Sequence, residues 1–488
     1  MIQNHQSIST KDQSRAMLAE AMPQREGQLE WRHALWTLKT RLQGELMLPG
    51  EDDFEAARSV WNGAYDRYPA LIVRCVDAAD VMTAINFARE HSLVVSVRSG
   101  GHSIVGHSTN DGGMVIDLSR MKAITIDPIR RTTRIEPGLT WAEVTEAAHP
   151  HGLALTSGDT DSVGVGGLLL GGGIGWMVRK YGLTIDRLRA VELVTADGAF
   201  LRASANEHSE LFWGLRGGGG NFGVATAFEV DLHLAGMVLG GAIFYDATDV
   251  KSLIRAYAHY AAAAPDELTT EALLMYAPPA PFLPQAQQGK LVFAIQLCYS
   301  GDLAEGERVV APLRALRTPI ADLVAPMPYP AIFPLTEDDP IRGFAHDGRS
   351  LFLETLNDEA LDTLAQEAVV FMAPGMAVQL RVLGGAMGRV PADATAFAHR
   401  DAQMMIVVAH AGPRPANTAF LHASMEQIWQ AIRPYRAGVY VNFLTEEGEQ
   451  RVREAYPAAT YARLAALKKH YDPTNLFHLN QNIKPSMH

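Results

Sequence analysis

The sequence predicts a protein of the α+β or mixed α/β class that is divided into at least two domains. Its 488 residues are too many for a single hydrophobic core. Helical segments and short β-branched strands follow one another without the regular alternation of a βαβ ladder. Glycine is frequent up to about residue 235 and scarcer beyond it, where the strand-like runs become longer. We therefore expect an extension over 1–45, a first domain over 46–235, a second domain over 236–435 and a C-terminal segment over 436–488.

The elements of the first half follow from hydrophobic periodicity and from capping residues. An amphipathic helix is expected over 28–42, and a second helix over 77–92, where Asp77 or Asp80 can cap the first turn. Short apolar runs predict strands over 94–98, 113–119, 123–128 and 132–138. The segments that come next are a helix over 140–152, a glycine-dense region over 158–175 and one strand over 189–204.

The elements of the second half are longer. The runs "LVFAIQLCYS", "MAVQLRVLGGA" and "MMIVVAHAG" predict strands over 291–300, 376–386 and 404–412, with helix-like segments between them. The last helix stops at Asp472-Pro473, and an amide-rich loop follows it.

Composition limits the function. Hydrophobic residues make up 48% of the chain and charged residues 20%, which is typical of a globular protein. The formal net charge of −12 argues against nucleic acid or an anionic membrane as a partner. No apolar run is long enough to span a bilayer, and the first residues lack the pattern of an export signal. We expect a monomer or homodimer that acts on a small molecule.

The two cysteines, Cys75 and Cys298, cannot form a disulfide framework or a zinc cluster. Each is expected to be a small core residue, and a reducing cytoplasm is the expected location. No metal site is predicted.

Four glycine clusters mark the first domain: "SGGH" at 99–102, "GVGG" at 164–167, "GGGIG" at 171–175 and "GGGGNFG" at 217–223. Consecutive backbone N–H groups in such loops bind anions and suit a pyrophosphate. One cluster alone would indicate a turn, but four in one domain favour a bound dinucleotide.

A Rossmann site is rejected. Gly218, Gly220 and Gly223 satisfy G-x-G-x-x-G, but that fingerprint must follow a strand and open a helix. Here the motif follows a helix-like segment and leads into "VATAFEVDLHL", which alternates as a strand. The pattern G-x-x-x-x-G-K-[ST] is also absent, so an ordinary P-loop is excluded.

His102 ends the first cluster, in "VRSGGHSIVGHS". A glycine-flanked histidine beside a dinucleotide could contact its redox ring, and the 8-methyl carbon of a flavin can be captured by imidazole. On its own, such a residue is more often a turn residue or a hydrogen-bond donor.

Four ordered motifs resemble those of the berberine bridge enzyme-like flavoproteins, members of the vanillyl-alcohol oxidase superfamily. They are "VRSGGHS--G", "VGVGGLLLGGGIGWMVRKYGLTIDRL", "LFWGLRGGGGNFGV" and "YDPTNLFHLNQNIKP". The resemblance covers residues 45 to 488 and is weakest between 240 and 430. It implies a PCMH-type FAD-binding domain of two α/β subdomains, a substrate domain with a large antiparallel sheet flanked by helices, and a C-terminal segment that returns to the FAD domain.

The resemblance also implies the cofactor contacts. His102 matches the histidine that bonds covalently to FAD. The other matching positions are Arg98, Ser99, Gly100, Gly101, Ser103 and Gly106 in the pyrophosphate loop, Gly164, Gly167, Gly172, Gly173 and Gly175 in the second loop, Gly223 and Val224 near adenine, and Asn442, Asn480 and Asn482 near the flavin ring.

Thr160 departs from the family pattern. Many members carry a cysteine there that makes a second link to the flavin, which a hydroxyl cannot readily make. The resemblance therefore implies attachment through His102 only. This is the pattern of the bacterial hydroxynicotine oxidase-like members, whose "RSGGH…NDGG" text is also similar.

Tyr440, in "YVNF", matches the tyrosine of a Y-x-N strand that points at the flavin face. Tyr440 would either act as the catalytic base or only pack against the substrate and hydrogen-bond it. A tyrosine that acts as a base at neutral pH needs a lowered pKa. A nearby cation could lower it, but no sequence feature identifies one. His107 would be a pocket wall, a supporting partner or a turn residue. His399 and Arg400 are expected to be structural, and Tyr329, Gln379 and Arg381 to line the pocket.

Val163 matches the position that helps to control oxygen access, where a small β-branched residue accompanies oxidases; it could also simply pack under the flavin. The resemblance thus implies an FAD-dependent oxidase that takes a hydride from an alcohol, sugar, cyclic amine or natural product and reduces molecular oxygen to hydrogen peroxide. The alternatives are a dehydrogenase with another acceptor and a flavin-holding protein without turnover.

Overall fold

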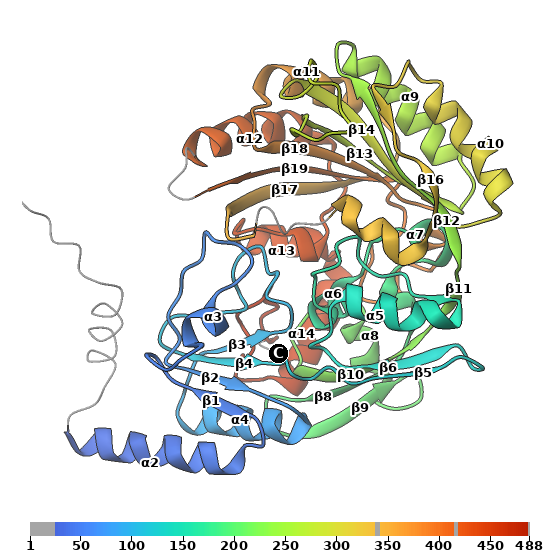
Figure 1. The fold of residues 1–488 in the computed structure, drawn as a ribbon. Coiled ribbons are helices and arrows are strands. Elements are labelled where there is room, and N and C mark those ends of the chain that lie inside the picture. Colours follow the sequence, from blue (N-terminus) through green and yellow to red (C-terminus); the bar gives the residue numbers. More distant parts are fainter. Residues whose placement is uncertain (1–24, 337–341, 414–417, 487–488) are drawn as a thin grey trace, which may run out of the picture.

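The computed structural model describes residues 25–336, 342–413 and 418–486. It combines two small sheets and a large antiparallel sheet with helices packed against them, so the predicted α+β class is confirmed. Figure 1 shows the large sheet in the upper part of the molecule and the two small sheets in the lower part. In the described part of the chain, no helix has both the length and the apolar character needed to cross a membrane.

The first small sheet has the order β1-β2-β4-β3, with only β1 antiparallel to its neighbour. Its strands are β1 (Glu45–Met47), β2 (Leu71–Arg74), β3 (Val95–Arg98) and β4 (Met114–Asp117). The helices beside it are α2 (Arg25–Arg41), α3 (Phe54–Arg58) and α4 (Ala78–Glu90). Asp77 caps α4 by accepting the N–H of Asp80, whose buried carboxylate in turn accepts the N–H groups of Gln43 and Gly44.

The second small sheet is antiparallel and has the order β5-β6-β10-β8-β9. Its strands are β5 (Ile124–Asp127), β6 (Thr132–Ile135), β8 (Leu188–Val194), β9 (Phe200–Ser204) and β10 (Val224–Asp231). The single strand expected over 189–204 was wrong: it is a hairpin, because Gly198 takes a φ of 82° and turns the chain between β8 and β9. The rejection of a Rossmann site is confirmed, since β10 follows the helix α8 (Ser209–Leu215).

Most of the remaining short elements of the lower part lie between β6 and β8 of the second sheet. Helix α5 (Trp141–Ala148) begins with a capping box in which Thr140 and Glu143 each accept the other's backbone N–H. The glycine-dense region that follows contains two helices, α6 (Val165–Gly171) and α7 (Val178–Tyr181). The strands β7 (Leu153–Ala154) and β11 (His233–Leu234) pair with each other.

The large sheet is antiparallel and runs β15-β12-β14-β13-β18-β19-β17, with β16 also on β12. Its strands are β12 (Met237–Asp246), β13 (Leu268–Tyr276), β14 (Leu291–Tyr299), β15 (Ala321–Asp322), β16 (Ala325–Pro328), β17 (Ala345–Leu353), β18 (Met376–Val382) and β19 (Met404–Gly412). The helices α9 (Val250–Ala263), α10 (Leu303–Arg314), α11 (Asp358–Phe371) and α12 (Thr418–Ile432) cover the face turned away from the small sheets (Figure 1).

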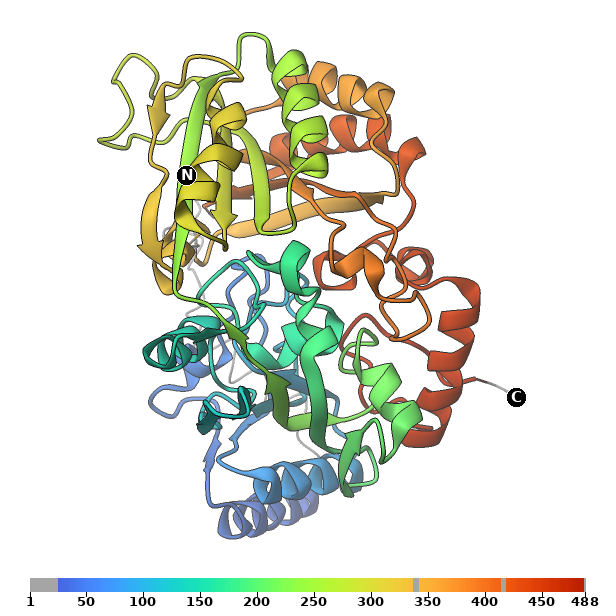
Figure 2. The same ribbon diagram turned by 90° about the vertical axis from the view of Figure 1, so that its right-hand side faces the viewer.

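Two C-terminal helices, α13 (Glu449–Ala455) and α14 (Ala458–Tyr471), lie along the side of the lower part of the molecule (Figure 2). The ammonium of Lys468, which is fully buried, donates to the backbone oxygen of Asn221 at 2.8 Å and pairs with Asp472 at 2.7 Å. This contact joins α14 to the fourth glycine cluster.

Candidate functional site

The first two glycine loops touch through their backbones. A Cβ atom on Gly100 would lie 2.4 Å from the nitrogen of Gly164, and a Cβ on Gly164 would lie 2.2 Å from the nitrogen of Gly100. Beside them, the hydroxyl of Ser99 donates to Pro137 O at 2.5 Å and accepts the N–H of Gly166 at 3.2 Å. Only glycine allows this approach, so both positions have a steric reason for their residue type.

His102 lies at the end of the loop that follows β3. The preceding residue, Gly101, has a φ of 75° and turns the backbone before His102. The indole of Trp61 stacks on the imidazole of His102, with 5.3 Å between the ring centroids. The Nε2 atom of His102 is buried and has no hydrogen-bond partner among the described residues. Burial lowers the pKa of His102 to about 4, helped by the charge of Arg342, so the imidazole is neutral at pH 7.

The other residues of this loop are held by contacts with neighbouring segments of the chain. Arg98 donates to the backbone oxygen of Ala57, and its guanidinium lies under Gly101. Ser103 accepts the N–H of Gly106 at 2.9 Å through its backbone oxygen, and Gly106, with a φ of 65°, contacts the ring of Tyr65.

His107 closes the same turn. Its backbone N–H donates to the hydroxyl of Ser103 at 3.2 Å, and its own Nδ1 is buried without a partner among the described residues. Burial lowers the pKa of His107 to about 4. It is therefore half-buried in the loop and is not a solvent-facing turn residue.

Helix α6 connects the remaining loops. The backbone oxygen of Leu170 accepts the N–H groups of Gly217 and Gly219 at 3.0 and 2.9 Å. At its other end, Gly167 has no atom within 4 Å of a Cβ position, so the chain leaves open space there. Just beyond α6, Gly173 has a φ of 87°, and Gly175 packs against the backbone of Ser157.

The amide-rich loop near the C-terminus lies against the fourth glycine cluster. Asn480 donates to Gly220 O at 3.1 Å, and Asn221 accepts the N–H of Ile483 at 2.9 Å. The Oδ1 atoms of Asn480 and Asn482 are buried without a partner among the described residues. Gly223 and Val224 are packed within the protein. Gly223 lies against the backbone oxygen of Val194, and Val224 is a core residue of β10 that pairs with Val194.

These features fit a dinucleotide. Open glycine positions at Gly167 and Gly220 border the loops, and three buried polar atoms without partners, on His102, Asn480 and Asn482, come from segments far apart in the sequence. Buried polar groups without a partner are uncommon in folded proteins and each needs an explanation. A dinucleotide carries donors and acceptors of the kind that such atoms need.

Tyr440 lies next to the second glycine loop. Its hydroxyl oxygen accepts the N–H of Gly173 at 2.8 Å and the Nδ2–H of Asn442 at 2.9 Å. Burial raises the pKa of Tyr440, while these donors and the charge of Arg381 act in the opposite direction. The expected Y-x-N strand was wrong, because Tyr440 precedes a 3₁₀ turn over Val441–Phe443 and does not belong to a sheet.

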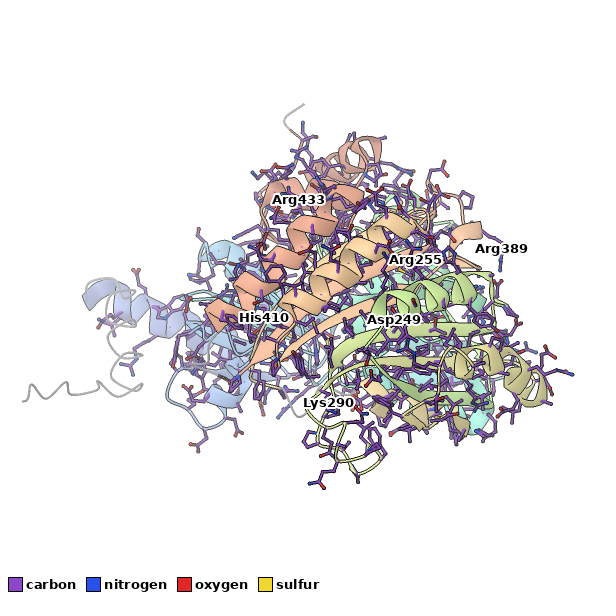
Figure 3. The ribbon with its side chains drawn as sticks, turned by 90° about the horizontal axis from the view of Figure 1, so that it is seen from above. Asp249, Arg255, Lys290, Arg389, His410 and Arg433 are labelled. Carbon is purple, nitrogen blue, oxygen red and sulfur yellow. The ribbon has the colours of Figure 1, made fainter. Side chains whose placement is uncertain are left out.

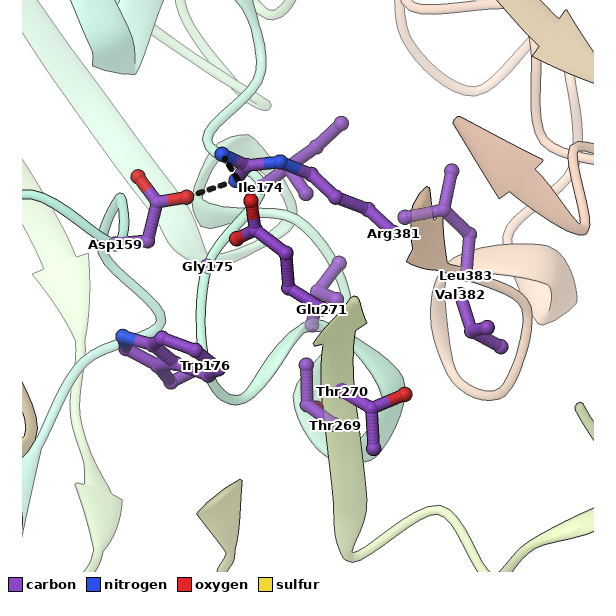
Figure 4. A pocket seen from close by; sticks show the side chains of 11 residues that line it. Asp159, Ile174, Gly175, Trp176, Thr269, Thr270, Glu271, Arg381, Val382 and Leu383 are labelled. Carbon is purple, nitrogen blue, oxygen red and sulfur yellow. Dashed lines mark hydrogen bonds and ion pairs between the residues drawn. The ribbon is translucent and has the colours of Figure 1, made fainter. Parts of the chain in front are cut away.

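Arg381, whose charge acts on Tyr440, is one of three charged side chains that line a small cavity (Figure 4). Arg381 of β18 pairs with Asp159, and with Glu271 of β13 at 3.2 Å. Its guanidinium lies 5.4 Å from the ring centroid of Phe443, and burial lowers the pKa of Arg381 to about 10. Arg381 is thus the cation near Tyr440 that the sequence did not identify.

The other predicted pocket residues lie nearby or in the core. Gln379 accepts a hydrogen bond from Arg381 at 3.2 Å, whereas Tyr329 is buried in a separate cluster with Trp176 and Phe333. Thr160 is largely buried and donates to Asp159 at 3.3 Å. Val163 is half-buried against the core of the lower part.

His399 and Arg400 have structural contacts, as expected. Arg400 is 1% exposed and forms a bidentate pair with Asp186 at 2.8 and 2.9 Å. His399 bonds to Glu454 O at 3.0 Å and packs against Gly438.

Sequence comparisons identify two family models. The model described as "FAD binding domain" matches residues 69–204, and the model described as "Berberine and berberine like" matches residues 439–484. The first match contains His102 and the first three glycine clusters, and the second match contains Tyr440.

Relatives match over most of the chain. (R)-6-hydroxynicotine oxidase of Paenarthrobacter nicotinovorans is 34% identical over 463 residues, which cover 91% of this chain and 97% of the relative. An FAD-linked oxidoreductase of Dictyostelium discoideum is 29% identical, covering 91% and 95%. The crystal structure of 6-hydroxy-D-nicotine oxidase from Arthrobacter nicotinovorans superimposes with a TM-score of 0.81 at 29% identity, covering 91% of this chain and 98% of that one.

Proposed function

Because the chain belongs to the berberine bridge enzyme-like family of FAD-linked oxidoreductases, we propose that it is an oxidase. It removes two electrons and two protons from a small substrate and passes them to molecular oxygen, giving hydrogen peroxide. The observation that carries the proposal is the hydroxyl of Tyr440, which accepts the N–H of Gly173 in the second glycine loop and is acted on by the charge of Arg381.

FAD is held by the part of the chain over 46–235 and by the amide-rich loop. The chemistry that FAD supplies when bound is the acceptance of a hydride and the transfer of two electrons to an acceptor. His102 is the single covalent attachment point. The backbone of Ser162 bonds to its imidazole, and its Nε2 has no partner among the described residues, so we assign the attachment to Nε2.

Tyr440 handles the substrate proton. Two N–H donors fix its hydroxyl oxygen, which stabilises a tyrosinate there, and the guanidinium of Arg381 adds a favourable charge. Burial opposes this and raises the pKa of Tyr440, so only the ionised fraction of the group, which grows with pH, accepts the substrate proton. Asn442 is a positioning residue that acts through the hydroxyl of Tyr440.

The substrate binds mainly to the part of the chain over 236–435. When Asp159, Glu271 and Arg381 are all ionised, two carboxylates face one guanidinium, so the cavity carries a net negative charge. Beside a bound substrate, this charge favours a neutral or cationic molecule, such as a sugar or a cyclic amine, over an acid. Relatives whose names specify 6-hydroxynicotine or chitooligosaccharide are consistent with this range.

The proposed enzyme works in a reducing compartment as a monomer or homodimer. Both cysteines are free and buried, and burial raises the pKa of each thiol, which makes them unreactive core residues.

Oxygen consumption and peroxide formation test the proposal. The flavin-loaded protein would be given both enantiomers of 6-hydroxynicotine, other cyclic amines, alcohols and oligosaccharides, with an oxygen electrode and a peroxidase-coupled assay as readouts. An oxidase forms one peroxide for each substrate oxidised. Turnover with a quinone or dye but not with oxygen would mean a dehydrogenase, and flavin that no substrate reduces would mean a binding protein.

A further inference from the structure

Three side chains with metal-binding atoms converge on the helix-covered face of the large sheet. Asp347 of β17 and His410 of β19 are direct cross-strand partners, so both side chains point to the same face. His422 of α12 lies opposite them. Figure 3 views this face from above, with His410 near the ends of the helices α11 and α12.

The ligating atoms of these residues are close enough for one ion. One atom from each residue lies within 4.8 Å of the others, and His422 Nδ1 is 2.9 Å from Asp347 Oδ2. The two imidazole rings are nearly perpendicular, at 84°, with centroids 6.4 Å apart. The side chain of His422 is half-exposed, which leaves it room to reorient around an ion.

His410 is the independent observation that points to a ligand. The residue is 5% exposed, and neither of its ring nitrogens has a hydrogen-bond partner among the described residues. A neutral imidazole has one donor and one acceptor, and leaving either buried and unpaired is unfavourable. A metal ion bonded to one nitrogen would account for this arrangement.

Asp347 is held so that one oxygen remains directed at the histidines. Its Oδ1 atom accepts the N–H of Gly348 at 2.8 Å and a guanidinium N–H of Arg349 at 2.9 Å. Arg349 also pairs with Glu426 at 3.6 Å and with Glu447 at 3.7 Å. Because its positive charge is shared among three carboxylates, it does not fully neutralise the charge of Asp347. A second partner that orients a ligating carboxylate is the usual support of a metal site.

This cluster is separate from the flavin site. Neighbouring residues of a strand point to opposite faces of its sheet, and His346, next to Asp347, stacks on Trp61, which in turn stacks on His102. Asp347 therefore lies on the other face of β17 from the loop that holds His102.

We propose that Asp347, His410 and His422 bind a divalent transition metal ion such as Zn²⁺, with water completing its coordination. Two imidazoles and one carboxylate are ligands that suit Zn²⁺ and that do not suit Mg²⁺ or Ca²⁺. The ion joins the N-terminal part of α12 to the edge of the large sheet and so stabilises the substrate domain. The proposal does not depend on the substrate or on the electron acceptor.

The test is Zn²⁺ binding by the flavin-loaded full chain after dialysis against a chelator. A chromophoric competitor and elemental analysis should give one high-affinity ion per chain. The variant His422→Ala, at a half-exposed position, should weaken binding by more than the roughly 100-fold that loss of an outer-shell partner can cost. Asp347→Asn should do the same, which guards against a folding defect of one variant.

His259→Ala is the matched control. His259 pairs with Asp358 at 2.6 Å on the same face of the molecule but belongs to no group of three ligands among the described residues. The His259→Ala variant should bind Zn²⁺ as tightly as the wild type does. Zn²⁺ should raise the Tm of the wild type and of His259→Ala, but not that of His422→Ala. The proposal is overturned if the wild type takes up no tightly bound ion, or if His422→Ala and Asp347→Asn bind it as tightly as the wild type.

Discussion

The hydroxyl oxygen of Tyr440 accepts the backbone N–H of Gly173 at 2.8 Å, although the two residues are 267 positions apart in the chain. Gly173 can present this N–H because its φ of 87° turns the backbone outward from the end of α6. Asn442 donates to the same oxygen, so both donors favour the ionised form of the tyrosine. The opposing effect of burial on the Tyr440 pKa is what the first prediction tests.

If Tyr440 is the catalytic base, kcat should rise with pH into the alkaline range. A base acts in its deprotonated form, and burial raises the pKa of this tyrosine above its ordinary value of about 10. Tyr440→Phe should flatten the profile and lower kcat by about 10²- to 10⁴-fold. A variant that keeps the alkaline limb and changes only KM would show instead that Tyr440 packs against the substrate and hydrogen-bonds it.

Arg381→Met should move the alkaline limb to higher pH, because the guanidinium lowers the pKa of Tyr440 and its loss leaves two buried carboxylates. The same change should cost about 3–5 kcal/mol of stability, which denaturant unfolding would measure. Arg381→Lys keeps the charge and should keep the limb near its original position. The exposed pair Arg389–Asp266 supplies the control: Arg389→Met should change neither property, and an unmoved limb in Arg381→Met would contradict the argument.

Local features of the fold could be predicted from the sequence. The cap of α4 at Asp77 and the capping box of α5 depend on neighbouring residues, and both helices were expected close to their observed bounds. Helix α6 was not expected, because glycine has a low helix propensity and three of its seven residues are glycines. Its start is fixed by contacts with the hydroxyl of Ser99 and the backbone of Gly100, which lie more than 60 residues earlier.

The site was only partly predictable for the same reason. His102 and the glycine loops stand in compact motifs, whereas Asp159 and Arg381 form their ion pair across 222 residues. Asp159 follows a glycine in a sequence segment that is typical of a turn, and Glu271 lies within a strand. No local pattern marks either residue as a partner of Arg381, and only the packing of β13 and β18 beside the second glycine loop brings the three together.

His102→Ala should release the flavin. Acid-precipitated wild-type protein should stay yellow, and the precipitated variant should be colourless with its FAD in the supernatant. His107→Ala is the control, because His107 lies in the same loop, is also half-buried and also has a pKa lowered to about 4. Its pellet should remain yellow. A colourless wild-type pellet from flavin-loaded protein would rule out a covalent bond.

Thr160→Cys should allow a second covalent link, because the resemblance to the family puts a cysteine at this position in doubly linked members. Peptide mass spectrometry of the wild type should find flavin on the His102 peptide alone, and the variant should show it on both peptides with a changed flavin spectrum. Thr156→Cys, at another buried threonine nearby, should remain singly linked. A flavin adduct on any other wild-type peptide would mean that the attachment is assigned wrongly.

Val163→Leu tests control of oxygen access. The backbone of this loop is fixed, since the Val163 oxygen accepts the N–H of Trp141 at 3.1 Å and Val165 donates to Leu139 O at 2.9 Å. The added methylene must therefore be accommodated by the side chains around the half-buried Val163, at a cost of about 1–3 kcal/mol where the site is tight.

If the larger leucine side chain blocks the route of oxygen, the reduced flavin should react with oxygen more slowly. Contact between the substrate and the flavin should not change. Stopped-flow measurements separate the two half-reactions, and we expect reoxidation in air to slow much more in Val163→Leu than reduction by substrate. The exposed Val370 provides a control, because Val370→Leu makes the same change at a position that is 66% exposed, and both rates should remain unchanged. If the wild-type reduced flavin persists in air-saturated buffer but reacts promptly with a quinone, oxygen is not the acceptor and the protein is a dehydrogenase. If both half-reactions slow equally in Val163→Leu, the side chain affects the packing around the flavin and does not control oxygen.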